Sequence, residues 1–353
     1  MGGARHQEYR IALVVPLQGS EGMFGPSCEL CGRLAARRVN DRGGVLAREV
    51  VLVVVDGARP PSAVADEIDL LLRAGEIDAV VGWHISAVRE ALAPRIAGRV
   101  PYVYTALYEG AAPRPGVFYT GETPGAQVVP ALSWMASEMG VRRWTVVGND
   151  YIWPRRSAAA GGRGARAVGA ELVDSVFLPL GTTDFGPALR RIEAANTDGV
   201  LMFLVGADAV RFNRQFAEAG LDARWRRLTP LMDENMLMAS GPDAVRGIFT
   251  AAGYFEALPT PENLQFSGEF ARAYGIEAPV LNSAGESCFE GIEMLATILT
   301  AAGTTDMAAV CAAAESLRYD GPRGSVEVRG GHVRQRIYMA TPTDLEYDIL
   351  ASL

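Results

Sequence analysis

Lysine is absent from this chain, since all 33 of its basic residues are arginine. The absence excludes reaction classes that need a lysine amine, such as Walker phosphate loops, Schiff bases on pyridoxal phosphate and Ser-x-x-Lys hydrolases. Histidine is also scarce, and His6, His84 and His332 lie too far apart to form a ligand pair at helical spacing. The sequence therefore indicates no metal site and no cofactor.

Cysteine occurs only four times, at positions 28, 31, 288 and 311. Cys28 and Cys31 have the spacing of a redox CxxC pair and stand near an expected helix start. A redox pair normally follows its strand directly, whereas a loop of several residues intervenes here. We therefore favour small buried thiols, with redox chemistry and a structural disulfide as the alternatives.

Long apolar runs are missing too, and none approaches the roughly 18 residues of a membrane span. The polar N-terminus shows no signal-peptide pattern, so we expect a cytoplasmic protein without membrane insertion as the sequence stands. Removal of a leader would instead imply a periplasmic or extracellular protein. The net charge of −8 argues against nucleic acid as a partner. The arginines between positions 155 and 166 are expected to form a solvated helix face.

The chain, at 353 residues, is about twice the usual domain size, which predicts two domains. In its first third, buried-strand runs alternate with amphipathic helices. The predicted strands are 10–16, 49–55, 78–82 and 100–104, and the predicted helices are 27–39, 62–74 and 86–97. A second series follows a Pro/Gly-rich passage, with helices 126–139, 155–168, 184–195 and 207–219 and strands 143–148, 171–177, 198–204 and 227–231. Helices 262–274, 284–302 and 306–316 and a hairpin within 324–340 complete a pattern of two doubly wound α/β sheets.

Loops after the strands are the expected place for a site, because doubly wound sheets bind ligands at the carboxyl ends of their strands. Ser86 begins a helix, where it either only caps that helix or presents its hydroxyl and the free N–H groups to a ligand oxygen. Tyr104 follows one strand, and Tyr151 and Trp153 follow another. These aromatic residues would either sandwich a small polar ligand or simply pack at the surface.

Two pairs of carboxylates, Asp233 with Glu234 and Glu286 with Glu290, are either solvated charges or functional groups. Asp233 could accept a ligand ammonium or amide N–H. The stretch 285–289 lacks the closing glycine of a nucleophile elbow, and the early glycines are spaced wrongly for a dinucleotide. With no catalytic constellation, we predict a receptor and not an enzyme. The alternative is a hydrolase that uses Glu286 or Asp233 in a cleft.

Six stretches resemble, in order, the amide and urea branch of the type I periplasmic-binding-protein (solute-binding) family. They are VVGWHISAVREALAP, YTALYEG, VFYTGETPGAQVVPALSWM, VVGNDYIWPRRS, FLPLGTTDF and GPRGSVEVRGGHVRQRIYMA. That branch includes urea-transport receptors and the cytoplasmic regulator of aliphatic amidase expression, and it is related more distantly to leucine/isoleucine/valine-binding proteins. The resemblance covers roughly residues 10–345.

The resemblance implies two doubly wound lobes joined by a three-crossover hinge. Lobe 1 would comprise residues 1–120 and 253–325, and lobe 2 residues 121–252 and 326–353. A small polar ligand, such as a short amide, urea, an amino acid or a derivative, would bind between the lobes and favour their closure. The expected partner is an ABC permease or a regulatory protein.

Ligand contacts in the family fall, by resemblance, on Ser86, Tyr104, Tyr151 and Trp153. This sequence departs from the family at His84, where a tyrosine or tryptophan is usual, and at Ala106, where a hydroxyl residue is common and Thr105 stands beside it. We expect these departures to alter the polarity and size of the pocket. His84 would either add a switchable charge or stay neutral and hydrogen-bonded.

Overall fold

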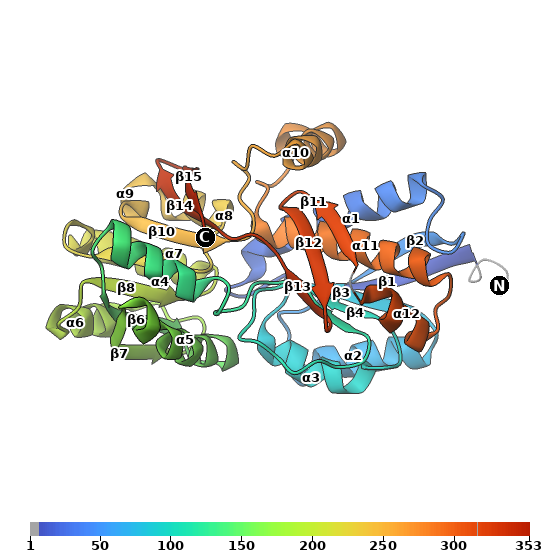
Figure 1. The fold of residues 1–353 in the computed structure, drawn as a ribbon, viewed down its shortest axis with the longest axis horizontal. Coiled ribbons are helices and arrows are strands. Elements are labelled where there is room, and N and C mark those ends of the chain that lie inside the picture. Colours follow the sequence, from blue (N-terminus) through green and yellow to red (C-terminus); the bar gives the residue numbers. More distant parts are fainter. Residues whose placement is uncertain (1–6, 316) are drawn as a thin grey trace.

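Two sheets organise the chain, which is described here by a computed structural model for residues 7–315 and 317–353 (Figure 1). The first sheet has eight strands in the order β11-β12-β13-β5-β4-β3-β1-β2. Its strands are β1 (Glu8–Val15), β2 (Glu49–Asp56), β3 (Ala79–Gly82), β4 (Tyr102–Tyr104), β5 (Val117–Tyr119), β11 (Arg318–Gly321), β12 (Gly324–Arg329) and β13 (His332–Arg334). The helices of this lobe are α1 (Gly25–Asp41), α2 (Pro61–Arg73), α3 (Ser86–Ile96), α10 (Pro261–Tyr274), α11 (Ser283–Ala302) and α12 (Met307–Ala314).

The second sheet has seven strands in the order β15-β14-β10-β9-β8-β6-β7. Its strands are β6 (Arg143–Asn149), β7 (Glu171–Leu178), β8 (Gly199–Phe203), β9 (Arg226–Thr229), β10 (Ile248–Ala252), β14 (Tyr338–Thr343) and β15 (Glu346–Ser352). The helices of this lobe are α4 (Val128–Glu138), α5 (Ile152–Ala165), α6 (Gly186–Ala194), α7 (Ala207–Glu218), α8 (Glu234–Ser240) and α9 (Pro242–Val245).

Both lobes repeat one topology, in which the second parallel strand is at the edge and the first lies beside the third. Continuous apolar runs such as β1 and β8 are buried because helices cover both faces of each sheet. This arrangement confirms the predicted two doubly wound lobes. It also places one topological switch point in each lobe, between β1 and β3 and between β6 and β8, where ligands bind in such sheets.

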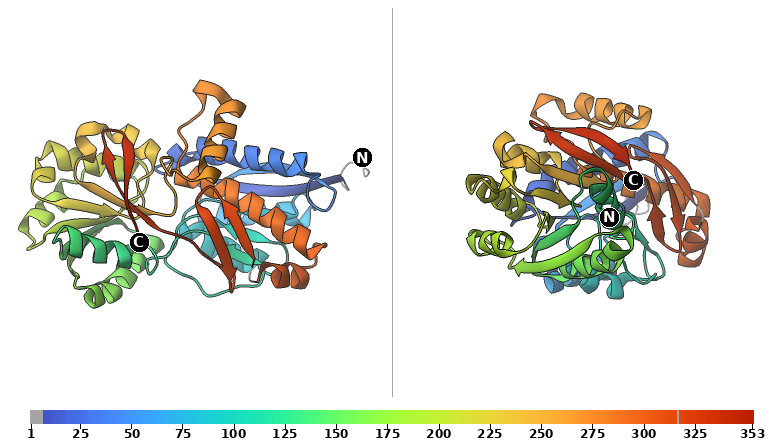
Figure 2. Two further views of the ribbon diagram at one scale, coloured as in Figure 1. Left: turned by 45° about the horizontal axis from the view of Figure 1, so that its top comes forward. Right: turned by 60° about the vertical axis from the view of Figure 1, so that its left-hand side comes forward.

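The chain crosses between the sheets after β5, after β10 and after β13, and Figure 2 shows these segments in the middle of the molecule. The third crossover differs from the expected boundary at residue 325. Strands β12 and β13 form the predicted hairpin at Gly330-Gly331, but β12 also pairs with β11 and β13 with β5. Residues 326–334 therefore belong to the sheet of lobe 1.

No single helix within residues 7–315 and 317–353 is long and apolar enough to cross a membrane. Helices α11 and α12 meet the length and composition test only as a pair, with a bend of 111° between them. Most of α11 is buried against the rest of lobe 1.

Candidate ligand-binding site

Loops at the carboxyl ends of strands from both sheets surround one small cavity. Lobe 1 contributes the residues after β3 and β4, and lobe 2 those after β6, β8 and β9. The lining residues are Trp83, His84, Ile85, Ser86, Tyr104, Ala106, Leu107, Tyr151, Trp153, Val205 and Leu231. The empty space among them is about 250 Å³, of which only about 10 Å³ can hold the centre of a water molecule. The walls of this cavity are therefore close together, and none of its lining side chains carries a formal charge.

Six of the eight predicted site residues line this cavity: His84, Ser86, Tyr104, Ala106, Tyr151 and Trp153. Ser86 is the first residue of α3, and Tyr104 is the last residue of β4. Trp153 was expected in a loop but lies in the first turn of α5, because that helix begins at Ile152. Tyr151 precedes the helix with an extended backbone.

Aromatic rings form walls of the cavity in both lobes. In lobe 2, the rings of Tyr151 and Trp153 lie 6.3 Å apart at 38°, and Trp153 meets Phe203 edge-on at 5.7 Å. In lobe 1, the Tyr104 hydroxyl donates to the carbonyl oxygen of His84 at 2.8 Å. Burial raises the pKa of Tyr104 to about 12, so this hydroxyl stays protonated at neutral pH. Such rings offer flat apolar faces to a planar ligand.

Ser86 is held by a buried ion pair below the cavity. Its hydroxyl donates to Glu109 Oε2 at 2.7 Å, and Glu109 Oε1 accepts from Arg89 Nη2 at 2.7 Å. The Arg89 guanidinium also binds Glu90 and lies 5.2 Å from the centre of the Tyr104 ring. Arg89 is thus neutralised by carboxylates of lobe 1, and its charge is not free for a ligand anion.

His84 is neutral in this environment. Its Nε2 lies 3.0 Å from the Tyr102 hydroxyl, and its Nδ1 lies 3.3 Å from the Ile85 carbonyl oxygen. Burial, with a smaller contribution from the nearby Arg89 charge, lowers the pKa of His84 to about 3. Of the two roles expected for His84, the structure therefore supports the neutral, hydrogen-bonded one.

Thr105 and Asp233 lie outside the cavity. Successive strand residues face opposite sides of a sheet, so Thr105 points towards α11, where its hydroxyl is 3.9 Å from Cys288 Sγ. Asp233 Oδ2 accepts from the backbone N–H of Ala284, at the start of α11, at 3.1 Å. Burial raises the pKa of Asp233 to about 7. This contact joins lobe 2 to lobe 1 without facing the cavity.

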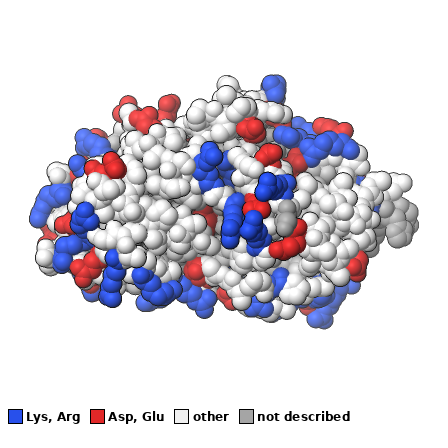
Figure 3. Space-filling view, in the orientation of Figure 1, with Lys and Arg blue, Asp and Glu red and all other residues white. Residues whose placement is uncertain are grey.

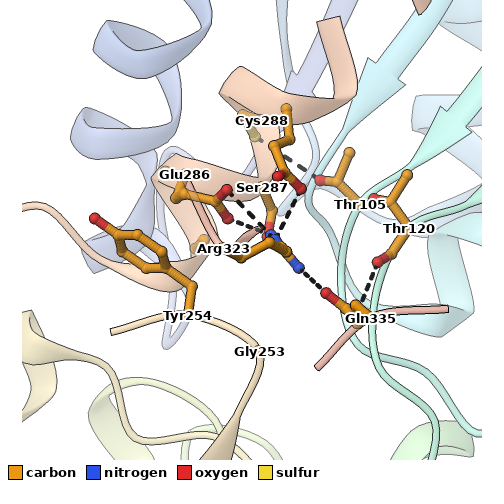
Figure 4. Close-up of polar contacts among 12 residues, drawn as sticks. Thr105, Thr120, Gly253, Tyr254, Glu286, Ser287, Cys288, Arg323 and Gln335 are labelled. Carbon is orange, nitrogen blue, oxygen red and sulfur yellow. Dashed lines mark hydrogen bonds and ion pairs between the residues drawn. The ribbon is translucent and has the colours of Figure 1, made fainter. Parts of the chain in front are cut away.

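Glu286 does not face the cavity either. Figure 4 shows its carboxylate turned towards Arg323, which binds both of its oxygens. Arg323 also contacts Glu290 at 2.8 Å and donates to Ser287 Oγ at 2.8 Å. Both oxygens of Glu286, one of the two carboxylates that the hydrolase alternative would use, are therefore bound by Arg323.

Cys28, Cys31 and Cys288 are buried free thiols, and Cys311 is a partly exposed one. Burial raises the pKa of Cys28 and of Cys31 well above the ordinary range, so both stay protonated. The interpretation as small buried thiols is confirmed. No group of His, Cys, Asp and Glu side chains suited to a metal ion occurs among the described residues, and His6 lies outside them.

The lobes touch around the cavity. Ser20 in lobe 1 donates to Asp208 Oδ1 of lobe 2 at 2.9 Å, and the Ser20 carbonyl accepts from Ala207 N. On another side, Arg156 on α5 lies 3.6 Å from Glu109. The two lobes are therefore in contact around a cavity that residues of both lobes line.

Several residues that shape the site were not predicted. Trp83 directly precedes His84 at a strand end, so the strand-end rule could have found it. Arg89 lies one helical turn after Ser86 on α3, a spacing that could have linked the two. Val205 and Leu231 are ordinary apolar residues that nothing in the sequence distinguishes.

This fold and cavity define a two-lobed solute-binding protein. A family model described as "Periplasmic binding protein" matches residues 8–344. The chain belongs to this family. Among curated proteins it is similar to Leu/Ile/Val-binding protein homolog 6 of Brucella melitensis, with 28% identity over 302 residues, 82% of this chain and 76% of that protein.

Solved structures of low sequence identity share the fold. One is a solute binding protein of an ABC transporter from Rhodopseudomonas palustris BisB5 in complex with 3,4-dihydroxy benzoic acid. It has a TM-score of 0.85 and 23% identity, and the match covers 98% of this chain and 97% of that one. Another is a leucine binding protein from Thermotoga maritima, with a TM-score of 0.85, 19% identity and 98% coverage of both chains.

Proposed function

We propose that this protein is a receptor for a small, uncharged, planar ligand such as a short amide, urea or an aromatic amide. One observation carries the proposal: the cavity between the lobes is lined by aromatic, aliphatic and a few neutral polar side chains, and by no charged one. An anion would need a cation that Arg89 does not supply, because Glu109 and Glu90 already bind it.

Polar recognition would come from the Ser86 oxygen, which can accept from a ligand N–H while its own hydrogen is donated to Glu109. The first N–H groups of α3 would suit a carbonyl oxygen. The rings of Tyr104, Tyr151 and Trp153 would enclose the planar part of the ligand. Contacts from both lobes would stabilise the closed conformation over an open one.

We further propose that the receptor delivers its ligand to an ABC permease outside the cytoplasm, as its family membership and the transporter-associated structural relatives suggest. An amino-acid ligand is disfavoured because Asp233, the carboxylate that would accept its ammonium group, binds Ala284 instead. We do not retain the hydrolase alternative, since Glu286 and Asp233 both lie away from the cavity.

Calorimetric titration with acetamide, urea, benzamide, benzoate and leucine tests the proposal. We expect at least one neutral compound to bind about tenfold or more tightly than benzoate and leucine. Trp153→Ala should weaken that binding about tenfold or more, since it removes one wall of the cavity. Trp134→Phe, on the outer helix α4, is the matched control and should leave the affinity unchanged. Tight binding of benzoate or leucine with no binding of the neutral compounds would contradict the proposal.

A further inference from the structure

A second cavity, in which about 400 Å³ can hold the centre of a water molecule, lies on a different part of the lobe boundary. It is formed by α8, the second crossover, the segment before α11 and the β14–β15 hairpin. Its lining residues are Glu234, Met238, Glu256, Ala257, Val280, Leu345, Glu346 and Tyr347. None of them lines the aromatic cavity between the lobes.

Three of these residues are glutamates, and no arginine forms an ion pair with any of them within the described part of the chain. By contrast, the buried carboxylates of Glu109 and Glu286 form ion pairs with arginines. Figure 3 shows further acidic side chains over the end of the β14–β15 hairpin, where Asp344 is exposed beside the cavity. The cavity therefore has an acidic lining.

Glu234 gives a second and independent indication of a ligand. Its side chain is only 5% exposed, and its Oε1 accepts from the backbone N–H of Glu256 at 2.8 Å. Its Oε2 is buried and has no hydrogen-bond partner among residues 7–315 and 317–353. A buried polar atom without a partner is costly, and such atoms are rare in folded proteins.

The carboxyl groups also repel one another. Burial raises the pKa of Glu234 well above its usual range, and the neighbouring charges of Asp233 and Glu256 raise it further. The pKa of Glu256 is raised by burial and by the charge of Glu346. A positive group in the cavity would offset this repulsion and would donate a hydrogen bond to Glu234 Oε2.

The remaining walls are apolar and limit the kind of cation that fits. Met238 is 53% exposed, and Ala257, Val280 and Leu345 line the cavity beside it. No arrangement of ligating side chains suited to a metal ion was found in the described residues, these glutamates included. We propose that this cavity is a second binding site, for a small organic cation that carries an ammonium or guanidinium group on a short apolar stem.

The site would also sense lobe closure. Glu234 and Met238 belong to α8 of lobe 2, whereas Val280 belongs to lobe 1 and Glu256 to the second crossover. A cation here contacts both lobes, so its binding depends on the same conformation that forms the aromatic cavity. The proposal does not depend on the identity of the ligand in that cavity.

The test is a calorimetric titration with agmatine, which carries a guanidinium and an ammonium group on a short alkyl chain. We expect one bound agmatine per chain, with an affinity that falls as the salt concentration rises. The double variant Glu256→Gln/Glu346→Gln should bind at least about tenfold more weakly, because two of the three charges are removed. Glu193→Gln, which removes an exposed charge on α6, is the matched control and should bind like the wild type.

Two further variants test whether agmatine binds at this site and not in the aromatic cavity, and whether weaker binding reflects a lost contact and not unfolding. Trp153→Ala should leave agmatine binding within about twofold of the wild type, since its effect is confined to the other cavity. Glu234→Gln keeps the shape of the buried side chain, and thermal denaturation should show that the variant is folded while agmatine binding is weakened. The proposal is overturned if agmatine gives no binding heat, if the double variant binds it as tightly as the wild type, or if Trp153→Ala abolishes its binding.

Discussion

The starts of α8 and α11 face each other across the lobe boundary, yet their acidic groups have opposite environments. In α11, Asn282 caps its own helix by accepting from Gly285 N at 2.8 Å, and Glu286 binds Arg323. In α8, the side chain of Asp233 does not cap its own helix but accepts from Ala284 N of α11, and Glu234 has no arginine partner. One carboxylate site is thus neutralised by a buried cation, and the other depends on backbone N–H groups.

Buried carboxylates in this molecule thus occur in two settings, one in an ion pair with arginine and the other in hydrogen bonds with backbone N–H groups. Arg323 links α11 to the crossovers, since it donates to Gln335 Oε1 at 2.6 Å and Gln335 in turn donates to the Thr120 carbonyl at 3.0 Å (Figure 4). This cluster fixes the hinge to lobe 1. Asp233 and Glu234 have no such cation among the described residues, and burial raises the pKa of both carboxyl groups.

Arg323→Met should cause the largest loss of stability. The variant leaves Glu286 and Glu290 buried without a cation, and breaking a buried pair in this way costs about 3–5 kcal/mol. Urea denaturation of the wild type and the variant measures the difference. Arg329→Met, which removes an exposed arginine paired with Glu327, is the control and should cost less than about 0.5 kcal/mol. A loss below about 1 kcal/mol for Arg323→Met would show that the Glu286 carboxylate does not depend on its arginine, contrary to the contrast drawn with Glu234.

Asp233 should make stability depend on pH in the direction opposite to an ion-paired carboxylate. Burial raises its pKa in the folded protein to about 7 from the ordinary value of 3.8, so the folded state holds a proton that the unfolded state releases. The contribution is complete below pH 4 and is lost as the pH rises to about 7. Between pH 5.5 and 7 the loss is on the order of 2 kcal/mol.

Denaturation series at several pH values, run for the wild type and for Asp233→Asn, isolate this contribution from that of other carboxyl groups. The asparagine oxygen still accepts from Ala284 N but does not titrate. The variant should therefore lose less stability than the wild type over this range. Equal slopes for the two proteins would show that the Asp233 pKa is not raised.

Asn282→Ala should have the smallest of these effects. The variant removes the cap of α11 and the hydrogen bond between Asn282 Nδ2 and Ser27 Oγ, and loss of a cap costs about 1 kcal/mol. Thermal denaturation followed by circular dichroism measures it. Asp306→Ala removes the exposed cap of α12 and provides the comparison. If Asn282→Ala lowered the free energy of unfolding as much as Arg323→Met, the cap would stabilise α11 as strongly as the ion pair does, which contradicts this prediction.

Much of the fold could be predicted from the sequence because its parallel strands are buried on both faces and its helices are amphipathic. The two doubly wound sheets and the longer helices followed from those patterns, whereas the short helices α8 and α9 were not predicted. β5, β10 and β11 were not predicted, although β3, β4 and β9, which are about as short, were. β14 and β15 were missed as a pair because an antiparallel edge hairpin lacks the continuous apolar run of a central strand.

The candidate site was predictable where strand ends determine position, as for Ser86 and Tyr104. Side chains of neighbouring residues in an extended segment point to opposite faces of the sheet. Thr105, directly after β4, therefore points away from the cavity that Tyr104 lines. Asp233 was predicted from the same rule, but its carboxylate contacts the other lobe, a pairing that no local pattern contains. The Arg89–Glu109 pair likewise joins helix α3 to the loop after β4.

The order of the strands along the chain has a consequence for how the protein is made. The parallel strands of lobe 2 lie in one stretch, Arg143–Ala252 from β6 to β10. Lobe 1 is completed by β11, β12 and β13, which are synthesised only after these strands. While the ribosome translates the intervening residues, the edge of β5 is exposed to pairing with other chains. A nascent chain released before His332 would leave that edge open and lobe 2 without β14 and β15, so premature termination damages both lobes at once.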